Sequence, residues 1–129
     1  LGKGVADCVI NVESSHCYTD MDQFLDGVYR VLKPQGYFLF ADFRDKEVLP
    51  YLKKQLVSRF EIIKEEVITP NVLKALDMDN DRRMNLIKKL VPKLLHKHSK
   101  DFAGTKGSRT YSSFATGKKE YFFFVLKKA

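Results

Sequence analysis

The sequence predicts an α/β fold, and three observations support this class. Residues 5–12 (VADCVINV) and 37–41 (YFLFA) are short apolar runs of the kind that form buried strands of a parallel sheet. Between these two runs, apolar residues repeat at helical spacing. A third apolar run, residues 121–126 (YFFFVL), lies near the end of the chain. The order strand, helix, strand predicts a βαβ unit with parallel strands and a right-handed crossover.

The helix of this unit is expected to begin at Thr19. The Thr19 hydroxyl can cap the first turn, and Asp22, three residues later, completes a capping box. Pro34 and Gly36 follow as the expected helix terminators. The apolar stripe of this helix consists of Met21, Phe24, Leu25, Val28 and Leu32.

A second helix and a third strand are predicted after the βαβ unit. Apolar residues recur at helical spacing over residues 48–60, which predicts the helix. Residues 61–69 mix apolar with charged side chains, a composition that suits a strand at the edge of a sheet.

A helical insertion is predicted for residues 70–113. Its apolar pattern is interrupted by the charged segment 77–83 (DMDNDRR) and resumes from Met84 to Leu95. Lysines occupy much of the other side of this second part, so we interpret them as a solvated helix face. Residues 101–118 are rich in Gly, Ser and Thr and predict a loop.

Length and composition favour one soluble domain, residues 1–129, without a metal centre. The chain has 129 residues, 44% of them hydrophobic, and its two cysteines are too few for a disulfide scaffold. No run approaches the roughly 20 apolar residues that span a bilayer. No secretory pattern opens the sequence, so we expect a cytoplasmic protein. His96 and His98 diverge on a helix and offer no zinc site.

The formal net charge of +7 is unevenly distributed. Residues 1–60 carry eight basic and eight acidic side chains, whereas residues 61–129 carry 15 and eight. The basic character of residues 61–129 favours contact with nucleic acid or with an anionic surface. A solvated helix face explains the same lysines, so we expect no nucleic-acid partner and leave contact with a membrane surface open.

Polar side chains follow the first two predicted strands, at the carboxyl ends where open α/β sheets bind their ligands. His16 follows the first strand and Asp42 the second, so the two can approach each other across one crevice. A carboxylate beside a histidine fixes its tautomer and stabilises its cation, as a general base requires. Glu13 is a third polar candidate at the same rim. For each of the three, a loop residue bonded to the backbone remains the alternative.

Residues 11–44 (NVESSHCYTDMDQFLDGVYRVLKPQGYFLFADFR) resemble the stretch from the fourth to the fifth strand of class I S-adenosylmethionine-dependent methyltransferases. The motifs that carry the likeness are the VESSH turn, the RVLKPQG segment and the strand-ending ADF. Within the family, the sequence is most similar to enzymes that act on natural-product sugars and on lipid phenols and alcohols of the phthiotriolone type. Residues 102–129 are similar to the ends of the lipid-modifying members.

The resemblance implies a Rossmann-like sheet, of which this chain holds the C-terminal half. The family orders its strands 3-2-1-4-5-7-6, and the predicted strands correspond to 4-5-7-6, with strand seven antiparallel and helices on the faces of the sheet. Strands one to three, with the glycine-rich cofactor turn, have no counterpart in the sequence. We therefore expect this chain alone to be inactive, and strand four to present an open edge through which a homodimer could form.

By the same resemblance, the cofactor is S-adenosylmethionine and the reaction is methyl transfer to an oxygen, less readily a nitrogen, of a small or lipid-like acceptor. His16 would act as general base, with Asp42 as its orienting group or a second base. Asn11, Val12 and Glu13 would line the cofactor cleft, and the insertion would form part of the acceptor lid. The alternative is a non-catalytic basic fragment that docks on an anionic surface or nucleic acid.

Overall fold

The computed structural model describes residues 2–103 and 105–129. The chain forms two compact units, which are described separately. The first unit comprises Leu1–Val67 and Tyr121–Ala129 and contains most of a four-stranded sheet with two helices. The second unit, Ile68–Glu120, is mainly helical.

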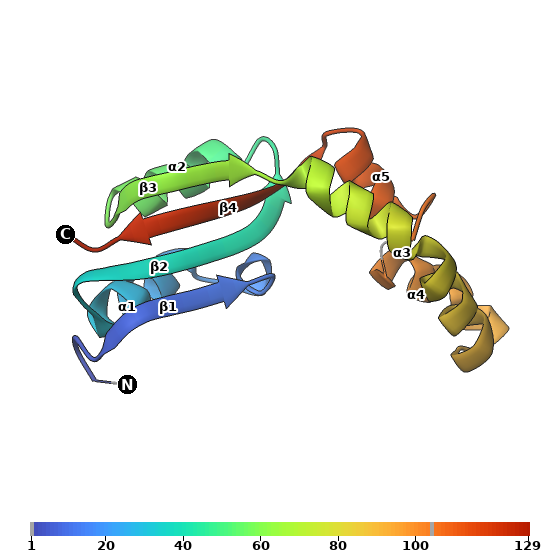
Figure 1. The fold of residues 1–129 in the computed structure, drawn as a ribbon, viewed down its shortest axis with the longest axis horizontal. Helices are drawn as coiled ribbons and strands as arrows, with labels where there is room; N and C mark the ends of the chain where they lie inside the picture. The colour runs from blue at the N-terminus through green and yellow to red at the C-terminus, as the bar shows by residue number, and fades with distance from the viewer. Residues whose placement is uncertain (1, 104) are drawn as a thin grey trace. The chain divides into compact units, whose positions relative to one another are not determined.

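The four strands lie in the order β1-β2-β4-β3. β1 and β2 pair in parallel, with Val9 opposite Phe38, whereas β3 and β4 pair antiparallel. Figure 1 shows β4 running against the direction of its neighbours. The predicted order 4-5-7-6, with one antiparallel strand, is therefore confirmed, as is the edge position of the third predicted strand. The strand bounds are Ala6–Val12 (β1), Leu32–Asp45 (β2), Glu61–Val67 (β3) and Lys119–Lys127 (β4).

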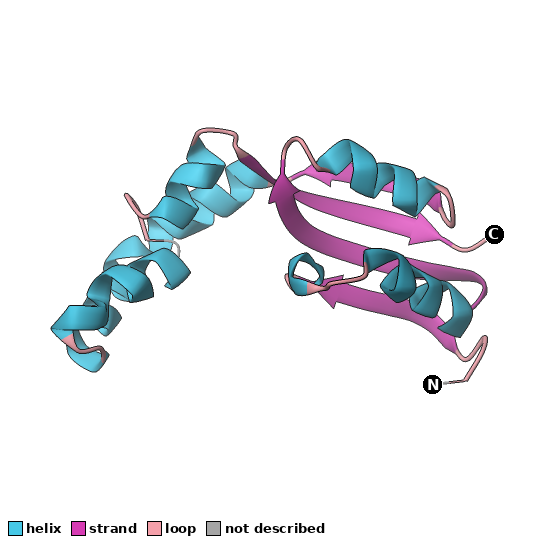
Figure 2. Cartoon of the chain, turned by 180° about the vertical axis from the view of Figure 1, so that it is seen from behind, coloured by secondary structure: helices cyan, strands magenta, loops and turns pink. Residues whose placement is uncertain are grey.

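Helices α1 (Met21–Val31) and α2 (Leu49–Val57) cover the same face of this sheet, as Figure 2 shows. Their apolar stripes meet alternate residues of the central strands, and the side chains between them are almost fully buried. This packing forms the core of the first unit and fixes the ends of β1 and β2. Its most deeply buried members are Leu25, Leu32, Phe38, Phe40, Leu56 and Leu126.

At β1, the opposite face of the sheet is exposed. Ile10 is 67% and Val12 59% exposed, so the prediction that the first strand is buried on both faces is wrong for this chain. The reason is that α1 and α2 both pack on one side of the sheet, so the side chains of β1 that point to the other side are not covered.

The start of α1 differs by one residue from the prediction. Asp20 rather than Thr19 is the N-cap, because its carboxylate accepts a 2.8 Å hydrogen bond from the Gln23 backbone N–H. Both residue types are good caps, and the sequence alone does not decide between two adjacent candidates.

Pro34 and Gly36 do not form a separate turn after α1, because β2 begins at Leu32 and includes them. The β1–β2 register shifts between Ala6 and Cys8, which absorbs this irregular stretch of β2 as a bulge. Gln35 adopts a positive φ of 67° within it. The Gly36 backbone is so enclosed that a Cβ there would lie 2.9 Å from the Lys33 carbonyl oxygen.

In the second unit, the predicted break at residues 77–83 is part of one continuous helix, α3 (Thr69–Leu90). Charged side chains within this stretch pair with each other along the helix: Asp79 accepts from Arg82 at 2.6 Å and from Arg83 at 2.8 Å. These hydrogen bonds lower the pKa of Asp79 to about 2. Charged residues that form hydrogen bonds with one another at helical spacing are thus compatible with a continuous helix.

The predicted loop at residues 101–118 contains helical turns. The helix α4 (His96–Ala103) reaches into it, and α5 (Arg109–Ala115) lies within it, while residue 104 is outside the described residues. Ser108 caps α5, since its Oγ accepts a 3.1 Å hydrogen bond from the Tyr111 backbone N–H. A short 3₁₀ turn, η2 (Lys93–Leu95), connects α3 to α4.

Among the described residues, none of the helices has both the length and the apolar character needed to cross a bilayer.

Candidate active site

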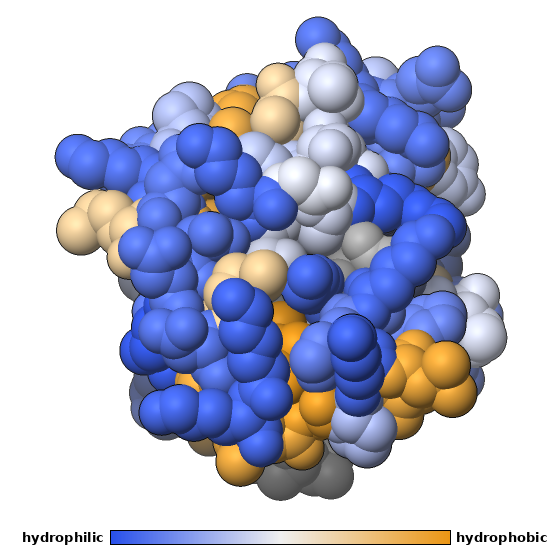
Figure 3. Space-filling model, turned by 90° about the vertical axis from the view of Figure 1, so that its right-hand side faces the viewer, coloured by the Kyte–Doolittle hydropathy of each residue, from blue (hydrophilic) through white to orange (hydrophobic). Residues whose placement is uncertain are grey.

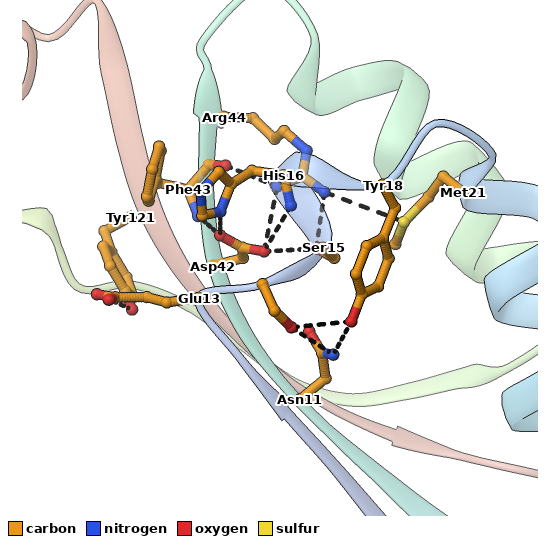
Figure 4. A network of polar contacts seen from close by, with 11 residues as sticks. Asn11, Glu13, Ser15, His16, Tyr18, Met21, Asp42, Phe43, Arg44 and Tyr121 are labelled. Atoms are coloured by element: carbon orange, nitrogen blue, oxygen red, sulfur yellow. Dashed lines mark hydrogen bonds and ion pairs between the residues drawn. The ribbon is translucent and has the colours of Figure 1, made fainter.

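Asp42 lies at the centre of a polar network at the carboxyl end of β2 (Figure 4). Its side chain is fully buried, and four donors converge on its two oxygens. Oδ1 accepts from the Phe43 backbone N–H at 2.9 Å and contacts His16 Nδ1 at 2.8 Å. Oδ2 accepts from the Ser15 hydroxyl at 2.5 Å and from the His16 backbone N–H at 3.1 Å.

This network keeps Asp42 ionised despite its burial. Desolvation alone raises the pKa of a carboxyl group, because burial disfavours the charged form. The hydrogen bonds from Ser15, Phe43 and His16, together with the positive charge of Arg44, outweigh that effect, and the pKa of Asp42 lies below its ordinary value. Asp42 is therefore a carboxylate that can only accept hydrogen bonds at neutral pH.

The ionised carboxylate determines the tautomer of His16. Since Asp42 Oδ1 can only accept, His16 Nδ1 carries the proton of their 2.8 Å contact, and Nε2 of the neutral ring keeps a free lone pair. The ring packs against that of Phe43, with centroids 4.4 Å apart and the two planes tilted by 31°, which restricts its orientation. The His16 side chain remains 28% exposed, so a substrate can reach it.

His16 is carried by η1 (Ser15–Cys17), a 3₁₀ turn directly after β1. The predicted approach of His16 to Asp42 thus occurs because parallel strands place both carboxyl ends at one edge of the sheet. No hydrogen bond of His16 Nε2 to another described residue is found.

Two further residues, which the sequence analysis missed, complete this network. Ser15 is 2% exposed and bridges Asp42 to Arg44, whose Nη2 donates to Ser15 Oγ at 2.8 Å. Arg44 Nη1 also lies 3.4 Å from Asp42 Oδ2. Strand alternation was a usable signal for Arg44, because it lies two residues after Asp42 and so faces the same side.

Asn11 belongs to a separate polar cluster. Its Nδ2 donates to the Ser14 hydroxyl at 2.9 Å and to the Tyr18 hydroxyl at 3.2 Å. Its Oδ1 is buried and has no hydrogen-bond partner among the described residues. A buried acceptor without a partner is uncommon, and it is available to accept a hydrogen bond from a ligand or from water.

Glu13 lies in a third arrangement, away from Asn11 in Figure 4. Its backbone adopts the left-handed conformation, with φ of 49°, and its N–H donates to the Ala41 carbonyl at 3.0 Å. The Tyr121 hydroxyl, at the start of the last strand, donates to Glu13 Oε1 at 2.7 Å. Tyr121 is another residue that sequence reasoning missed, and Val12, between the two predicted polar residues, turns to the exposed face of the sheet.

A hollow of about 310 Å³ adjoins the Asp42 network. Its walls come from η1, the start of α1, the end of β2 and α2, and include Ser15, His16, Met21, Arg44 and Tyr51. This volume lies at the lower end of the range of small-molecule pockets. No group of three or more potential metal ligands occurs among the described residues.

The sheet order, in which the third strand runs antiparallel to its neighbours, is that of the second half of a Rossmann-like methyltransferase fold. A family description, "Methyltransferase domain", matches residues 1–40.

Relatives in sequence agree with this class. The chain is 28% identical over 123 residues to the phthiotriol/phenolphthiotriol dimycocerosates methyltransferase of Mycobacterium tuberculosis, covering 95% of this chain and 46% of that protein. It is 29% identical over 123 residues to the fatty-acid O-methyltransferase of Mycolicibacterium smegmatis, covering 95% of this chain and 44% of that protein. The chain thus spans about half the length of the curated relatives it matches.

Among solved structures, the phosphoethanolamine N-methyltransferase 2 of Haemonchus contortus, in complex with S-adenosylhomocysteine, has a similar fold. The TM-score is 0.74 at 15% identity, over 98% of this chain and 34% of that one. The chain is thus similar to class I S-adenosylmethionine-dependent methyltransferases in fold and, over most of its own length, in sequence.

The residues at the carboxyl end of β1 fit one wall of a site for this cofactor. The buried Asn11 Oδ1 lacks a donor, and the Glu13 carboxylate is held in place by Tyr121. Both are acceptors and suit the hydroxyl and ammonium groups of the cofactor.

Proposed function

We propose that the protein transfers a methyl group from S-adenosylmethionine to an oxygen of a lipid-like acceptor, with His16 as general base. The observation that carries this proposal is the 2.8 Å contact between His16 Nδ1 and the buried Asp42 carboxylate. It leaves the Nε2 lone pair available at the strand ends where this fold binds its ligands.

The chemistry needs a base, because a hydroxyl is a weak nucleophile until its proton is leaving. His16 Nε2 is placed to accept that proton as the acceptor oxygen forms its bond to the methyl carbon. When bound, the cofactor supplies a methyl carbon attached to a positively charged sulfur, and the electron pair of that bond remains with sulfur. Asp42 stabilises the imidazolium that results, since its carboxylate faces the protonated Nδ1.

Asp42 is a positioning residue in this scheme, and so are its partners. Ser15 and Arg44 occupy Oδ2, which leaves Oδ1 facing the His16 ring. Phe43 packs against that ring and restricts its rotation. A base whose tautomer and direction are both fixed before binding loses less entropy in the reaction.

The relatives support a lipid-like acceptor, because one is named for phthiotriol dimycocerosates and another for fatty acids. Asn11, Val12 and Glu13 are proposed to line the cofactor side.

The test is methyl transfer from labelled S-adenosylmethionine to a fatty acid and to a hydroxyl-bearing lipid, measured with the full-length protein. His16→Ala should lower kcat by at least about 10²-fold, the usual contribution of a general base. The KM for the acceptor should change little, and the pH dependence attributable to the base should disappear from kcat.

His98→Ala is the matched control, because His98 is an exposed histidine of the second unit. It should retain the kcat of the parent protein. Unchanged kcat in His16→Ala would remove His16 from the chemistry, and the absence of transfer to either lipid would contradict the acceptor class.

A further inference from the structure

The net charge of the protein belongs entirely to its second unit. In the first unit, eleven basic side chains face eleven acidic ones, whereas residues 68–120 carry twelve basic and five acidic side chains. The excess of basic over acidic side chains is greatest near the end of α3, because no acidic residue occurs between Asp81 and Asp101. Lysines are frequent in the same stretch.

Leucines accompany these lysines, and they are exposed. Leu94 is 92%, Leu90 76%, Leu95 49% and Leu86 41% exposed. Sequence periodicity predicts Leu90, Leu94 and Leu95, together with Ile87, as part of one apolar stripe, but of these four only Ile87 is buried, at 6% exposure. We name residues 86–97 the leucine–lysine segment.

The leucine–lysine segment combines exposed leucines and exposed lysines on one short stretch of chain. It comprises the end of α3, the turn η2 and the start of α4. Figure 3 shows orange apolar side chains standing between blue polar ones on the face that it draws. The exposed lysines of the segment are Lys88, Lys89, Lys93 and Lys97.

A solvated helix face accounts for the lysines but leaves the leucines unexplained. Exposed leucine side chains cost free energy in water, and several of them within ten residues exceed what a soluble surface usually shows. A nucleic acid would attract the lysines through its phosphates, yet it offers no apolar phase for the leucines. A bilayer with anionic headgroups satisfies both, because leucines enter the acyl boundary while lysines remain at headgroup level.

We propose that the leucine–lysine segment docks the protein on an anionic lipid bilayer. Charge complementarity identifies the partner: a segment with four exposed lysines and no acidic residue meets a surface of negative charge. Leu90 and Leu94 are the apolar anchors, since they are the most exposed of the four leucines.

The experiment is co-sedimentation of the chain with vesicles. Vesicles of equal parts phosphatidylcholine and phosphatidylglycerol should bind it, and vesicles of phosphatidylcholine alone should bind it at least about tenfold more weakly. Raising the salt concentration should weaken binding to the anionic vesicles, because screening shortens the range of the attraction.

Two pairs of variants separate the leucines from the lysines. Leu90→Gln with Leu94→Gln should lower the partition coefficient by at least about tenfold. Met78→Gln is its control, because Met78 is 79% exposed on the same helix but outside the segment, and it should bind like the parent. Lys88→Gln with Lys93→Gln should weaken binding similarly, whereas Lys74→Gln with Lys118→Gln, an equal change of charge elsewhere in the unit, should not.

Circular dichroism of each variant verifies that the helices persist. Binding that depends on the lysines but not on Leu90 and Leu94 would contradict the proposal and favour a purely electrostatic partner such as nucleic acid. A leucine-dependent dimer that ignores vesicles would contradict it in favour of a second copy. Absence of binding to anionic vesicles would also overturn it.

Discussion

The Tyr121 hydroxyl donates a 2.7 Å hydrogen bond to Glu13 Oε1, joining the last strand to the turn after the first across 108 residues of sequence. Burial of Tyr121 and this bond to a carboxylate both raise the pKa of its hydroxyl, so it remains a donor throughout the physiological range. The bond holds a residue whose backbone is in the left-handed region. Glu13 is thus fixed by long-range structure and not by its local sequence.

Tyr121→Phe is expected to destabilise the protein by about 1.5 kcal/mol, the lower end for a hydrogen bond to a charged group. Urea unfolding followed by circular dichroism measures the change. Tyr111→Phe is the matched control, because its hydroxyl also donates to a carboxylate, that of Asp77, but at an exposed position. It should unfold close to the parent, and equal losses in the two variants would show that burial does not strengthen the Tyr121 bond.

Asp42 should make the stability of the protein depend on acid pH. Its pKa is lower in the folded than in the unfolded chain, so its ionisation stabilises the folded state above pH ~4. This contribution should be lost as the pH falls from about 4 through the folded-state pKa. The free energy of unfolding, measured in urea at a series of pH values, should decline over that range.

Asp42→Asn should reduce this decline and destabilise the protein by roughly 3–5 kcal/mol at neutral pH, because Arg44 and the ring of His16 lose a buried partner. The exposed Asp45, at the end of the same strand, supplies the control Asp45→Asn, which should retain the decline. A parent protein whose stability is flat between pH 2 and 5, measured as before, would contradict the role given to Asp42.

Ser15→Ala should cost about 1–3 kcal/mol, because it leaves one oxygen of a buried carboxylate short of a donor. Ser14→Ala, one residue earlier, affects an exposed hydroxyl contact to Tyr18 and should cost less. Thermal and urea unfolding of the two variants compare them directly. A larger loss in Ser14→Ala would indicate that the network around Asn11, and not that around Asp42, stabilises this turn.

Gly36→Ala should destabilise the first unit by about 1–3 kcal/mol, since the added methyl meets the backbone oxygens of Lys33 and Asp7 at 2.9 and 3.1 Å. Gly27→Ala provides the opposite expectation: nothing lies within 4 Å of the added Cβ, and alanine favours the helix by roughly 0.8–1 kcal/mol. Urea midpoints of the two variants should therefore move in opposite directions. A stabilised Gly36→Ala would show that the bulge in β2 relaxes around the methyl group.

Much of the first unit was predictable from sequence, because its signals are local. Apolar runs located three strands, a mix of apolar and charged residues located the edge strand, and helical spacing located α1 and α2, to within a few residues for most ends. Parallel pairing then allowed the prediction that His16 and Asp42 can approach each other, and the structure places them in contact. The irregular start of β2 was not predictable, because Pro34 and Gly36 read equally as a turn or as a bulge.

The rest depends on contacts that a local pattern does not contain. The 77–83 stretch looks like a helix break until Asp79 is seen to pair with Arg82 and Arg83. Tyr121 reaches Glu13 only through the sheet order, and no spacing rule links residues so far apart. In the same way, the leucines near the end of α3 follow a helical period but have no partner element to bury them among the described residues.

The balance of charge in the first unit has a practical consequence. Since that unit is electrically neutral overall at pH 7, the retention of the protein on a cation-exchange column is governed by residues 68–120. Removal of these residues by proteolysis, or neutralisation of their lysines, is therefore expected to weaken that retention.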